Sequence, residues 1–275
     1  GSRGARGGRR WWRRALPALI VPVALGALIG TGLATVKRYG RATTDDPVAF
    51  AETALSAPKV RTVVLDPGHG GRRSPGSVGP NGLVEGDLTL DIARRLDALL
   101  RSHGFSVFMT RDEDRPVSLE RRAAMANEVG GDIFVSIHIN SLRDDDRGIE
   151  TFFFGPVEAR WLDDRDADGE EGSLVDLRRP SRVADASPRL RESRLLAEAV
   201  HRDLDWYLAQ VEPSMGERGI KTAPFVVLML TEMPAILAEV STLSHPDDAE
   251  LLELEAYREY IALALFNGIR AYSEG

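Results

Sequence analysis

The chain has 275 residues, of which 43% are hydrophobic and 28% charged, and its net charge at pH 7 is -7. This length suits one large domain or two small ones, and the composition is that of a globular protein. The acidic balance argues against nucleic acid as the main partner. The chain contains no cysteine. Disulfides and thiolate metal sites are therefore excluded, and any bound metal would need His, Asp or Glu ligands.

Residues 15–36 form an apolar run without a single charge. About 20 such residues suffice to span a bilayer. Arginines are frequent in residues 1–14, and fewer basic residues follow the run. Since the more basic flank stays inside, we expect residues 1–14 to be cytoplasmic and the rest of the chain to cross the membrane.

Three interpretations of residues 15–36 differ in their consequences. The length favours an uncleaved transmembrane anchor over a signal peptide, whose apolar core is shorter, although Gly32-Leu33-Ala34 is an acceptable cleavage site. The unbroken apolarity disfavours a buried core helix. The first two interpretations both predict an extracytoplasmic protein, with residues 37–58 as a linker to a domain over residues 59–275.

Strands and helices alternate from residue 59 onwards. We predict strands over residues 63–65, 105–109, 132–140, 149–154, 224–230 and 235–240. Helices are predicted over residues 85–100, 118–130, 189–210, 246–252 and 257–272. Residues 156–187 are acidic and aperiodic, which indicates an inserted solvated loop. The pattern predicts an α/β fold with a mixed, largely parallel central sheet and helices on both faces.

Two histidines and one glutamate lie beside the predicted strand ends. His69 follows the first strand within a glycine-rich turn, His138 comes near the end of the strand over residues 132–140, and Glu85 begins a helix. Two imidazoles and a carboxylate, with a fourth position for water, are a ligand set of catalytic zinc. A hydrogen-bonded core histidine is the alternative for each. The metal site is favoured because both histidines finish apolar strands, where open α/β sheets bind their ligands.

Glu239 lies at the end of the apolar run over residues 235–238. An acidic side chain in such a strand is costly unless it has a partner or a function. We predict that Glu239 handles protons at the metal site. Three other histidines are predicted to be structural: His103 at a helix cap, His201 on an amphipathic helix and His245 near a helix start.

Several segments occur in an order and spacing that we recognise from one family. They are Leu65-Asp66-Pro67-Gly68-His69-Gly70-Gly71, Asn81-Gly82-Leu83-Val84-Glu85, Thr110-Arg111, Leu119 with Arg122, Ala126-Asn127, Ser136-Ile137-His138-Ile139-Asn140, Arg218-Gly219-Ile220-Lys221 and Met233-Pro234-Ala235-Ile236-Leu237-Ala238-Glu239. From Val63 to Tyr272 the sequence resembles the zinc-dependent N-acetylmuramoyl-L-alanine amidases of the Amidase_3 family.

The resemblance implies a zinc enzyme whose substrate is peptidoglycan. It implies that His69, Glu85 and His138 bind Zn²⁺ and that Glu239 is the catalytic acid/base. The bond cleaved would be the amide between N-acetylmuramic acid and L-alanine of the stem peptide, in cell-wall remodelling or daughter-cell separation. Two alternatives stay open: a zinc peptidase that acts on stem peptides, and a non-catalytic, membrane-tethered scaffold that binds the wall.

The sequence departs from the family pattern in two places. Family members often have Leu-Ser-Asn-Pro after the catalytic strand, whereas this chain has Leu243-Ser244-His245-Pro246. Some amidases carry an inserted helix that blocks the zinc site until a protein activator removes it. Residues 156–187 occupy the corresponding region here, but their composition is that of a loop. Autoinhibition and the need for an activator are therefore left open.

Overall fold

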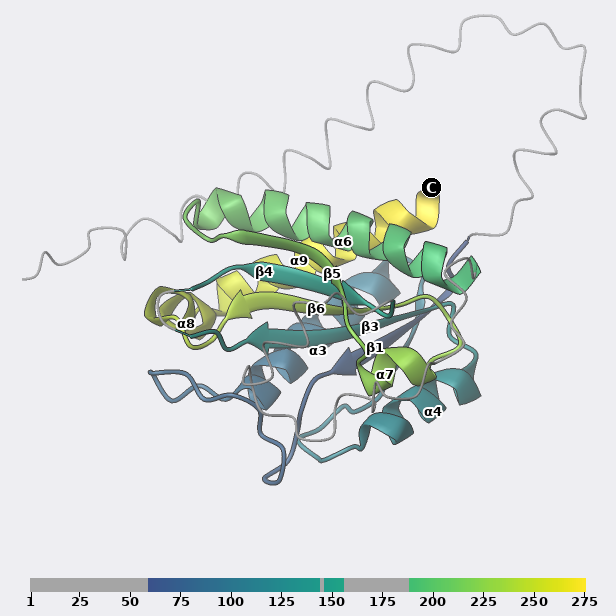
Figure 1. Ribbon diagram of the computed structural model, residues 1–275, viewed down its shortest axis with the longest axis horizontal. Helices are drawn as coiled ribbons and strands as arrows, with labels where there is room; N and C mark the ends of the chain where they lie inside the picture. The colour runs from purple at the N-terminus through teal and green to yellow at the C-terminus, as the bar shows by residue number, and fades with distance from the viewer. Residues whose placement is uncertain (1–58, 144–145, 156–187) are drawn as a thin grey trace, which may run out of the picture. The chain divides into compact units, whose positions relative to one another are not determined.

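The computed structural model of this chain describes residues 59–143, 146–155 and 188–275 (Figure 1). The predicted basic segment, transmembrane or signal helix, linker and acidic loop lie outside these residues. Within the described part of the chain, no helix combines the length and apolarity needed to cross a membrane.

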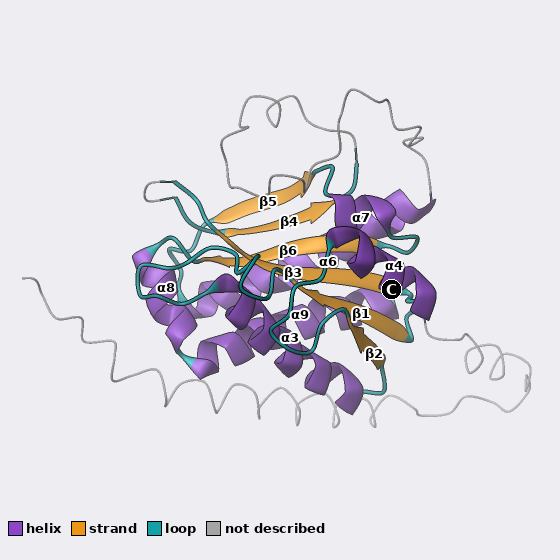
Figure 2. Ribbon diagram, turned by 90° about the horizontal axis from the view of Figure 1, so that it is seen from below, coloured by secondary structure: helices purple, strands orange, loops and turns teal. Residues whose placement is uncertain are grey.

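Six strands of the described residues form one sheet. They are β1 (Thr62–Pro67), β2 (Ser106–Met109), β3 (Ile133–Asn140), β4 (Ile149–Phe153), β5 (Glu217–Thr222) and β6 (Ala235–Thr242). Their order across the sheet is β2-β1-β3-β6-β4-β5 (Figure 2). The strands β2, β1, β3 and β6 run parallel, whereas β4 is antiparallel to β6 and parallel to β5. The predicted mixed, largely parallel sheet is confirmed.

Helices cover both faces of this sheet, as predicted (Figure 1). One layer contains α3 (Glu85–Ser102), α6 (Pro188–Val211) and α9 (Glu255–Glu274), and α4 (Leu119–Val129) and α7 (Val226–Leu230) pack on the opposite face. The short helix α8 (Pro246–Glu253) follows β6 and contacts α9. Each layer buries its own apolar cluster against the sheet.

The alternation of side chains along β3 and β6 places the polar residues on one face. Ile137 of β3 and Ala238 of β6 belong to the apolar cluster beneath α3, α6 and α9. Leu237 belongs to the cluster on the α4 and α7 side. Because successive side chains of a strand point to opposite faces, His138 and Glu239 lie on the α4 and α7 face.

Several predicted helix ends are confirmed. Ser118 is the N-cap of α4 and accepts a hydrogen bond from the backbone N–H of Arg121, which satisfies one of the free donors of the first turn. His103 is the C-cap of α3. His245 is the N-cap of α8, and its side chain accepts a hydrogen bond from the N–H of Asp247.

The predicted strand over residues 224–230 is wrong, because Val226–Leu230 is the helix α7. A short apolar run has the same pattern in a buried strand and a buried helix, and here tertiary contacts decide. Asn127 of α4 donates a hydrogen bond from its side chain to the carbonyl of Leu230, at the end of α7. The strand at this edge is instead β5, whose polar sequence Glu217–Thr222 has β4 as its one neighbour among the described strands.

Candidate metal centre

His69, Glu85 and His138 come together in the fold. One possible ligand atom from each lies within 4.8 Å of the other two. His69 lies in the turn that follows β1, Glu85 is the first residue of α3, and His138 belongs to β3. Since β1 and β3 are parallel neighbours, their carboxyl ends meet at one edge of the sheet. The three residues that the sequence singled out therefore form one cluster.

The Glu85 carboxylate is the centre of this cluster. Its Oε1 atom is 3.2 Å from Nε2 of His69 and 3.2 Å from Nδ1 of His138. The backbone N–H of Ile139 donates to Oε1 at 3.1 Å, and that of Ser77 donates to Oε2 at 3.0 Å. These bonds hold the carboxylate toward both imidazoles. Two imidazole nitrogens and a carboxylate oxygen converging in this way are a donor set that fits zinc.

The surroundings of Glu85 keep it ionised. Burial raises the pKa of this carboxyl, but hydrogen bonds and charge from His138 and His69 lower it by more, so the net pKa lies well below its ordinary value. The position of Glu85 in the first turn of α3 acts in the same direction, because the helix dipole stabilises negative charge there. An ionised carboxylate is the form that binds a cation.

His69 has a strained backbone. Its φ of 57° lies in the left-handed region, and it is the single non-glycine residue with positive φ in the described ranges. Such a conformation costs on the order of 1–3 kcal/mol and recurs at functional sites, where the surroundings enforce it. Here Arg122 donates a hydrogen bond from Nη2 to the His69 carbonyl at 2.5 Å. Oγ of Ser74 lies 3.5 Å from Nδ1 of the ring.

Gly68 allows the turn and the His138 ring to approach closely. A Cβ atom at Gly68 would lie 2.5 Å from both Cε1 and Nε2 of His138. The backbone N–H of Gly68 also donates to the carbonyl of Ile137 at 2.9 Å. Any larger side chain at this position would displace a candidate ligand.

Glu239 stands beside the cluster in the sheet. It is the register partner of His138 on the parallel neighbour β3 and of Glu150 on the antiparallel neighbour β4. The structure thus brings the predicted acid/base next to a predicted ligand. The strand is slightly longer than the predicted range of residues 235–240, because β6 continues through Thr242.

Glu150 was not among the predicted site residues. Its side chain is buried, and it forms an ion pair with Lys221 at 2.9 Å and another with Arg218. Its place opposite Glu239 brings a second carboxylate to this edge of the sheet. The sequence carried a clue, since Glu150 is an isolated acid within an apolar strand, and the same pattern had pointed to Glu239.

Comparisons with known proteins agree with this geometry. A family model described as N-acetylmuramoyl-L-alanine amidase matches residues 63–271. The chain belongs to this amidase family. It is 32% identical to YqiI of Bacillus subtilis, over 85% of this chain and 93% of that protein. It is 29% identical to the N-acetylmuramoyl-L-alanine amidase AmiA of Salmonella typhimurium, over 89% of this chain and 90% of that protein.

Solved structures show the same relationship. The N-acetylmuramoyl-L-alanine amidase AmiC2 of Nostoc punctiforme superimposes with a TM-score of 0.61 and 29% identity, covering 80% of this chain and 100% of that one. An N-acetylmuramoyl-L-alanine amidase of Clostridium difficile also gives a TM-score of 0.61, with 28% identity over 79% of this chain and 98% of that one. The chain is a peptidoglycan hydrolase of the amidase type, which acts in cell-wall remodelling.

The remaining histidines of this amidase lie outside the cluster, as predicted. His201 of α6 is buried, with Nε2 at 2.8 Å from Glu217 and Nδ1 at 3.0 Å from the hydroxyl of Thr151. His103 and His245 serve as helix caps.

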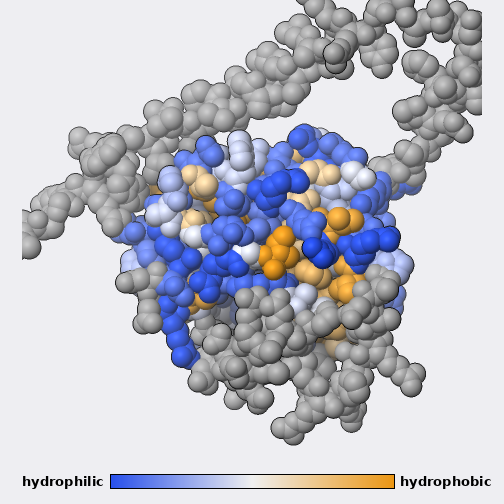
Figure 3. All heavy atoms as spheres, turned by 45° about the horizontal axis from the view of Figure 1, so that its top comes forward, coloured by the Kyte–Doolittle hydropathy of each residue, from blue (hydrophilic) through white to orange (hydrophobic). Residues whose placement is uncertain are grey.

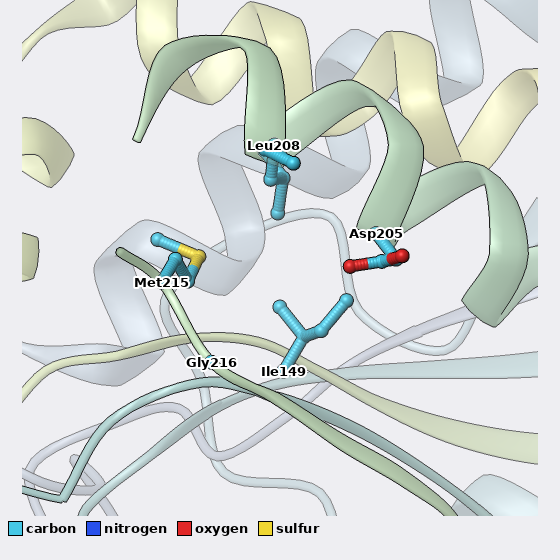
Figure 4. Close-up of a pocket in the computed structure, with 6 residues that line it drawn as sticks. Ile149, Asp205, Leu208, Met215 and Gly216 are labelled. Carbon is cyan, nitrogen blue, oxygen red and sulfur yellow. The ribbon is translucent and has the colours of Figure 1, made fainter. Parts of the chain in front are cut away.

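A small pocket in the amidase domain is separate from the cluster. It is lined by Ile149, Asp205, Leu208, Ala209, Met215 and Gly216 (Figure 4). Ile149 belongs to the apolar cluster beneath α6, on the face of the sheet opposite to His138. No ligand candidate lines this pocket, and we assign no substrate to it.

Proposed function

We propose that the amidase reaction of this chain depends on zinc, held by His69, Glu85 and His138, with Glu239 as the catalytic acid/base. The observation that carries the proposal is the convergence of the two imidazoles and the carboxylate beside Glu239. It also opposes the non-catalytic scaffold, because a wall-binding protein needs neither the ligand cluster nor the neighbouring acid.

The protein's contribution begins with the placement of the ligands. Neutral imidazoles and an ionised Glu85 give a donor set with one negative charge, and the hydrogen bonds of Glu85 to Ile139 and Ser77 fix its orientation. When bound, zinc supplies Lewis-acid chemistry, because it polarises a carbonyl oxygen and lowers the pKa of water from 15.7 to about 7.

Glu239 moves the proton in this proposal. Support for this role comes from its register pairing with His138 on the neighbouring strand. Glu239 accepts a proton from a water molecule as the water attacks the amide carbon, and it then delivers the proton to the departing alanine nitrogen. General acid/base groups contribute about 10²–10⁴-fold to such reactions. The amide between N-acetylmuramic acid and L-alanine is broken, and a peptide with a free L-alanine amino group is released.

We further propose that the reaction takes place outside the cytoplasm. Peptidoglycan lies there, and residues 15–36 have the length and apolarity of a membrane anchor or signal peptide. In this arrangement residues 1–14 stay in the cytoplasm, residues 37–58 link the anchor to the catalytic domain of residues 59–275, and residues 156–187 form an insertion in it. A role in daughter-cell separation and control by a protein activator are further parts of the proposal.

Mass spectrometry of peptidoglycan digested by the zinc-loaded protein tests the reaction. We expect intact stem peptides that begin with L-alanine. Peptides shortened within the stem would instead establish the peptidase alternative. Sacculi that stay intact even with protein that lacks residues 156–187 would favour the scaffold.

Substitutions test the residue roles. Glu239→Gln should keep stoichiometric zinc after dialysis but lower turnover by about 10²–10⁴-fold, whereas His69→Ala should lose both zinc and activity. Glu232→Gln, at an exposed position before β6, is the control and should behave as wild type. Full turnover by Glu239→Gln would show that Glu239 is not the catalytic acid/base. Full turnover by metal-free protein would show that the reaction does not need zinc.

A further inference from the structure

Arg111 is a fully buried arginine just after β2, with an exposed fraction of 0%. Its guanidinium donates to backbone carbonyls: Nε to Pro67 at 2.9 Å, and Nη2 to both Gly68 and Gly86 at 2.7 Å. The same Nη2 also lies 3.1 Å from the hydroxyl of Thr89. One nitrogen of Arg111 therefore joins the turn after β1 to the first turn of α3.

Two of the residues whose carbonyls accept from Arg111 are adjacent to candidate metal ligands. Gly68 immediately precedes His69, and Gly86 immediately follows Glu85. Gly68 also packs against the imidazole of His138, where a Cβ would come within 2.5 Å. The guanidinium of Arg111 thus binds the direct chain neighbours of His69 and Glu85, and one of these neighbours, Gly68, contacts the ring of His138.

The chemistry of this contact favours arginine over other residues. A guanidinium is planar and offers five N–H donors in a fixed fork, whereas a lysine ammonium offers three donors around one point. The fork matches carbonyls on separate segments: Pro67 and Gly68 after β1 and Gly86 in α3, while Nη1 donates to the carbonyl of Glu113 at 3.3 Å. The hydrogen bonds of Arg111 go to neutral acceptors, while the nearby carboxylate of Asp66 pairs with Arg122 at 2.8 Å.

Stability alone does not account for a charge in this place. Burying a cation against neutral groups is expensive, and apolar side chains of similar volume often serve a protein core as well or better. Burial, followed by the charge of Arg122, lowers the pKa of Arg111 to about 10, so it stays protonated at neutral pH. The feature that an apolar residue could not reproduce is the link between the two segments that carry the ligands.

We propose that Arg111 is a positioning residue of the metal centre, which fixes the separation of His69 and Glu85 and thereby sets the affinity for zinc. The inference rests on the proposed function, because it takes these residues as the ligands. Arg111 touches neither metal nor substrate in this scheme. It acts through the carbonyls of Gly68 and Gly86.

Arg111→Lys tests the proposal in the full-length, metal-loaded protein. The substitution keeps the positive charge but loses the planar, forked arrangement of N–H donors of the guanidinium. Competition with a chelator should show zinc affinity lower by about 10–100-fold, the range for groups that orient metal ligands. The visible spectrum of the cobalt-substituted protein should change, since it reports ligand geometry. Saturating zinc should restore part of the amidase activity that Arg111→Lys loses.

Arg258→Lys is the matched control. Arg258 of α9 also donates from Nη1 to two backbone carbonyls, those of Leu252 at 2.6 Å and Glu253 at 3.0 Å, but neither is adjacent to a candidate ligand. We expect this variant to lower the melting temperature without changing zinc affinity or the cobalt spectrum. If Arg111→Lys behaves in the same way, Arg111 is merely structural and the proposal is overturned.

Thr89 provides a second, milder test should Arg111→Lys fail to fold. Its hydroxyl donates to the Gly68 carbonyl at 2.8 Å and lies next to Arg111. Thr89→Val removes the hydroxyl with little change of shape and should weaken zinc binding by about tenfold, and Thr89→Ser should restore it. Unchanged zinc affinity in Thr89→Val would overturn the proposal. A wild-type protein that binds no zinc would instead overturn the proposed function.

Discussion

Two regions of this amidase are equally buried but built from opposite chemistry. The first, here called the polar junction, consists of Asp66, Arg111 and Arg122 around the carboxyl end of β1, and each is at most 3% exposed. The second is the contact between α6 and α9, where apolar side chains such as Leu204 and Leu265 are fully buried. On the face seen in Figure 3, hydrophilic side chains predominate, and apolar ones gather in small groups.

The difference indicates what each region contributes. Full burial of an apolar side chain stabilises a protein by about 1.5–3 kcal/mol, whereas a hydrogen bond contributes a net of about 0.5–1.5 kcal/mol. The α6–α9 contact therefore serves stability. The polar junction gives less stability for the same burial, but its donors fix three consecutive carbonyls, from Pro67 to His69. We infer that it serves the geometry of the metal centre.

The largest effect is expected for Asp66→Asn in the polar junction. Asp66 accepts hydrogen bonds from Arg122 and from the hydroxyls of Thr110 and Ser136. Asparagine would leave Arg122 buried without its anionic partner, which costs about 3–5 kcal/mol in the free energy of unfolding. Urea denaturation at pH 7 measures this loss. Asp91→Asn is the control, because Asp91 is 36% exposed and pairs with Arg95 and Arg258 nearer to solvent.

The same variant should change the response to acid. Burial raises the pKa of Asp66, but Arg122, Thr110 and Ser136 lower it by more, so its folded value lies below the ordinary 3.8. A lowered folded pKa stabilises the protein above the unfolded pKa, and this contribution is lost as the pH falls through the folded value. The difference in unfolding free energy between wild type and Asp66→Asn should therefore be full at pH 7 and shrink below pH 3.8. A difference that stays constant with pH would contradict the ionised state of Asp66.

Gly68→Ala should separate the metal centre from overall stability. The new Cβ would meet the His138 ring at 2.5 Å, so the ring must move away from Glu85. We expect zinc affinity to fall by about 100-fold or more, at or beyond the upper end of the effects known for groups that orient ligands. Isothermal titration with zinc measures it. Wild-type zinc affinity in this variant would mean that His138 is not a ligand.

Gly268→Ala makes the corresponding change in the α6–α9 contact. A Cβ at Gly268 would lie 2.5 Å from Cα of Val200, so α9 would be pushed from α6. Overpacking of this kind costs about 1–3 kcal/mol, and thermal unfolding measures it. Zinc affinity should stay at the wild-type value. Loss of zinc in the folded Gly268→Ala protein would show that the two regions are coupled.

The clustering of the candidate metal ligands could be predicted from the sequence because it follows from strand ends. His69 and His138 each follow an apolar run, and parallel strands bring such ends to one edge of a sheet. Glu85 could be identified as the third candidate ligand because it begins a predicted helix. Asp66 and Arg111 could be read only as parts of a family motif. The role of Arg111 depends on which carbonyls the fold brings to it, and that of Asp66 on which donors the fold brings to its carboxylate. Residue spacing does not contain that information.

The antiparallel edge of the sheet was the least predictable part. Glu150 lies opposite Glu239 because β4 inserts between β6 and β5, an order that local patterns do not encode. The strand β5 is polar and borders a single strand among the described residues, so it lacks the apolar alternation of a buried strand. The apolar run of α7 was compatible with both kinds of element, and its contact with α4 made it helical.

The smallest effect is expected for Arg194→Ala, on the exposed side of α6. Arg194 forms an i,i+4 ion pair with Glu198 at 2.9 Å, and the two side chains are 68% and 45% exposed. Because solvent screens such a pair, its loss should cost about 0.3–0.5 kcal/mol, measured by urea denaturation, and leave zinc affinity unchanged. A fall in zinc affinity here would mean that metal binding follows overall stability wherever the chain is altered. The separate roles assigned to the polar junction and the α6–α9 contact would then be untenable.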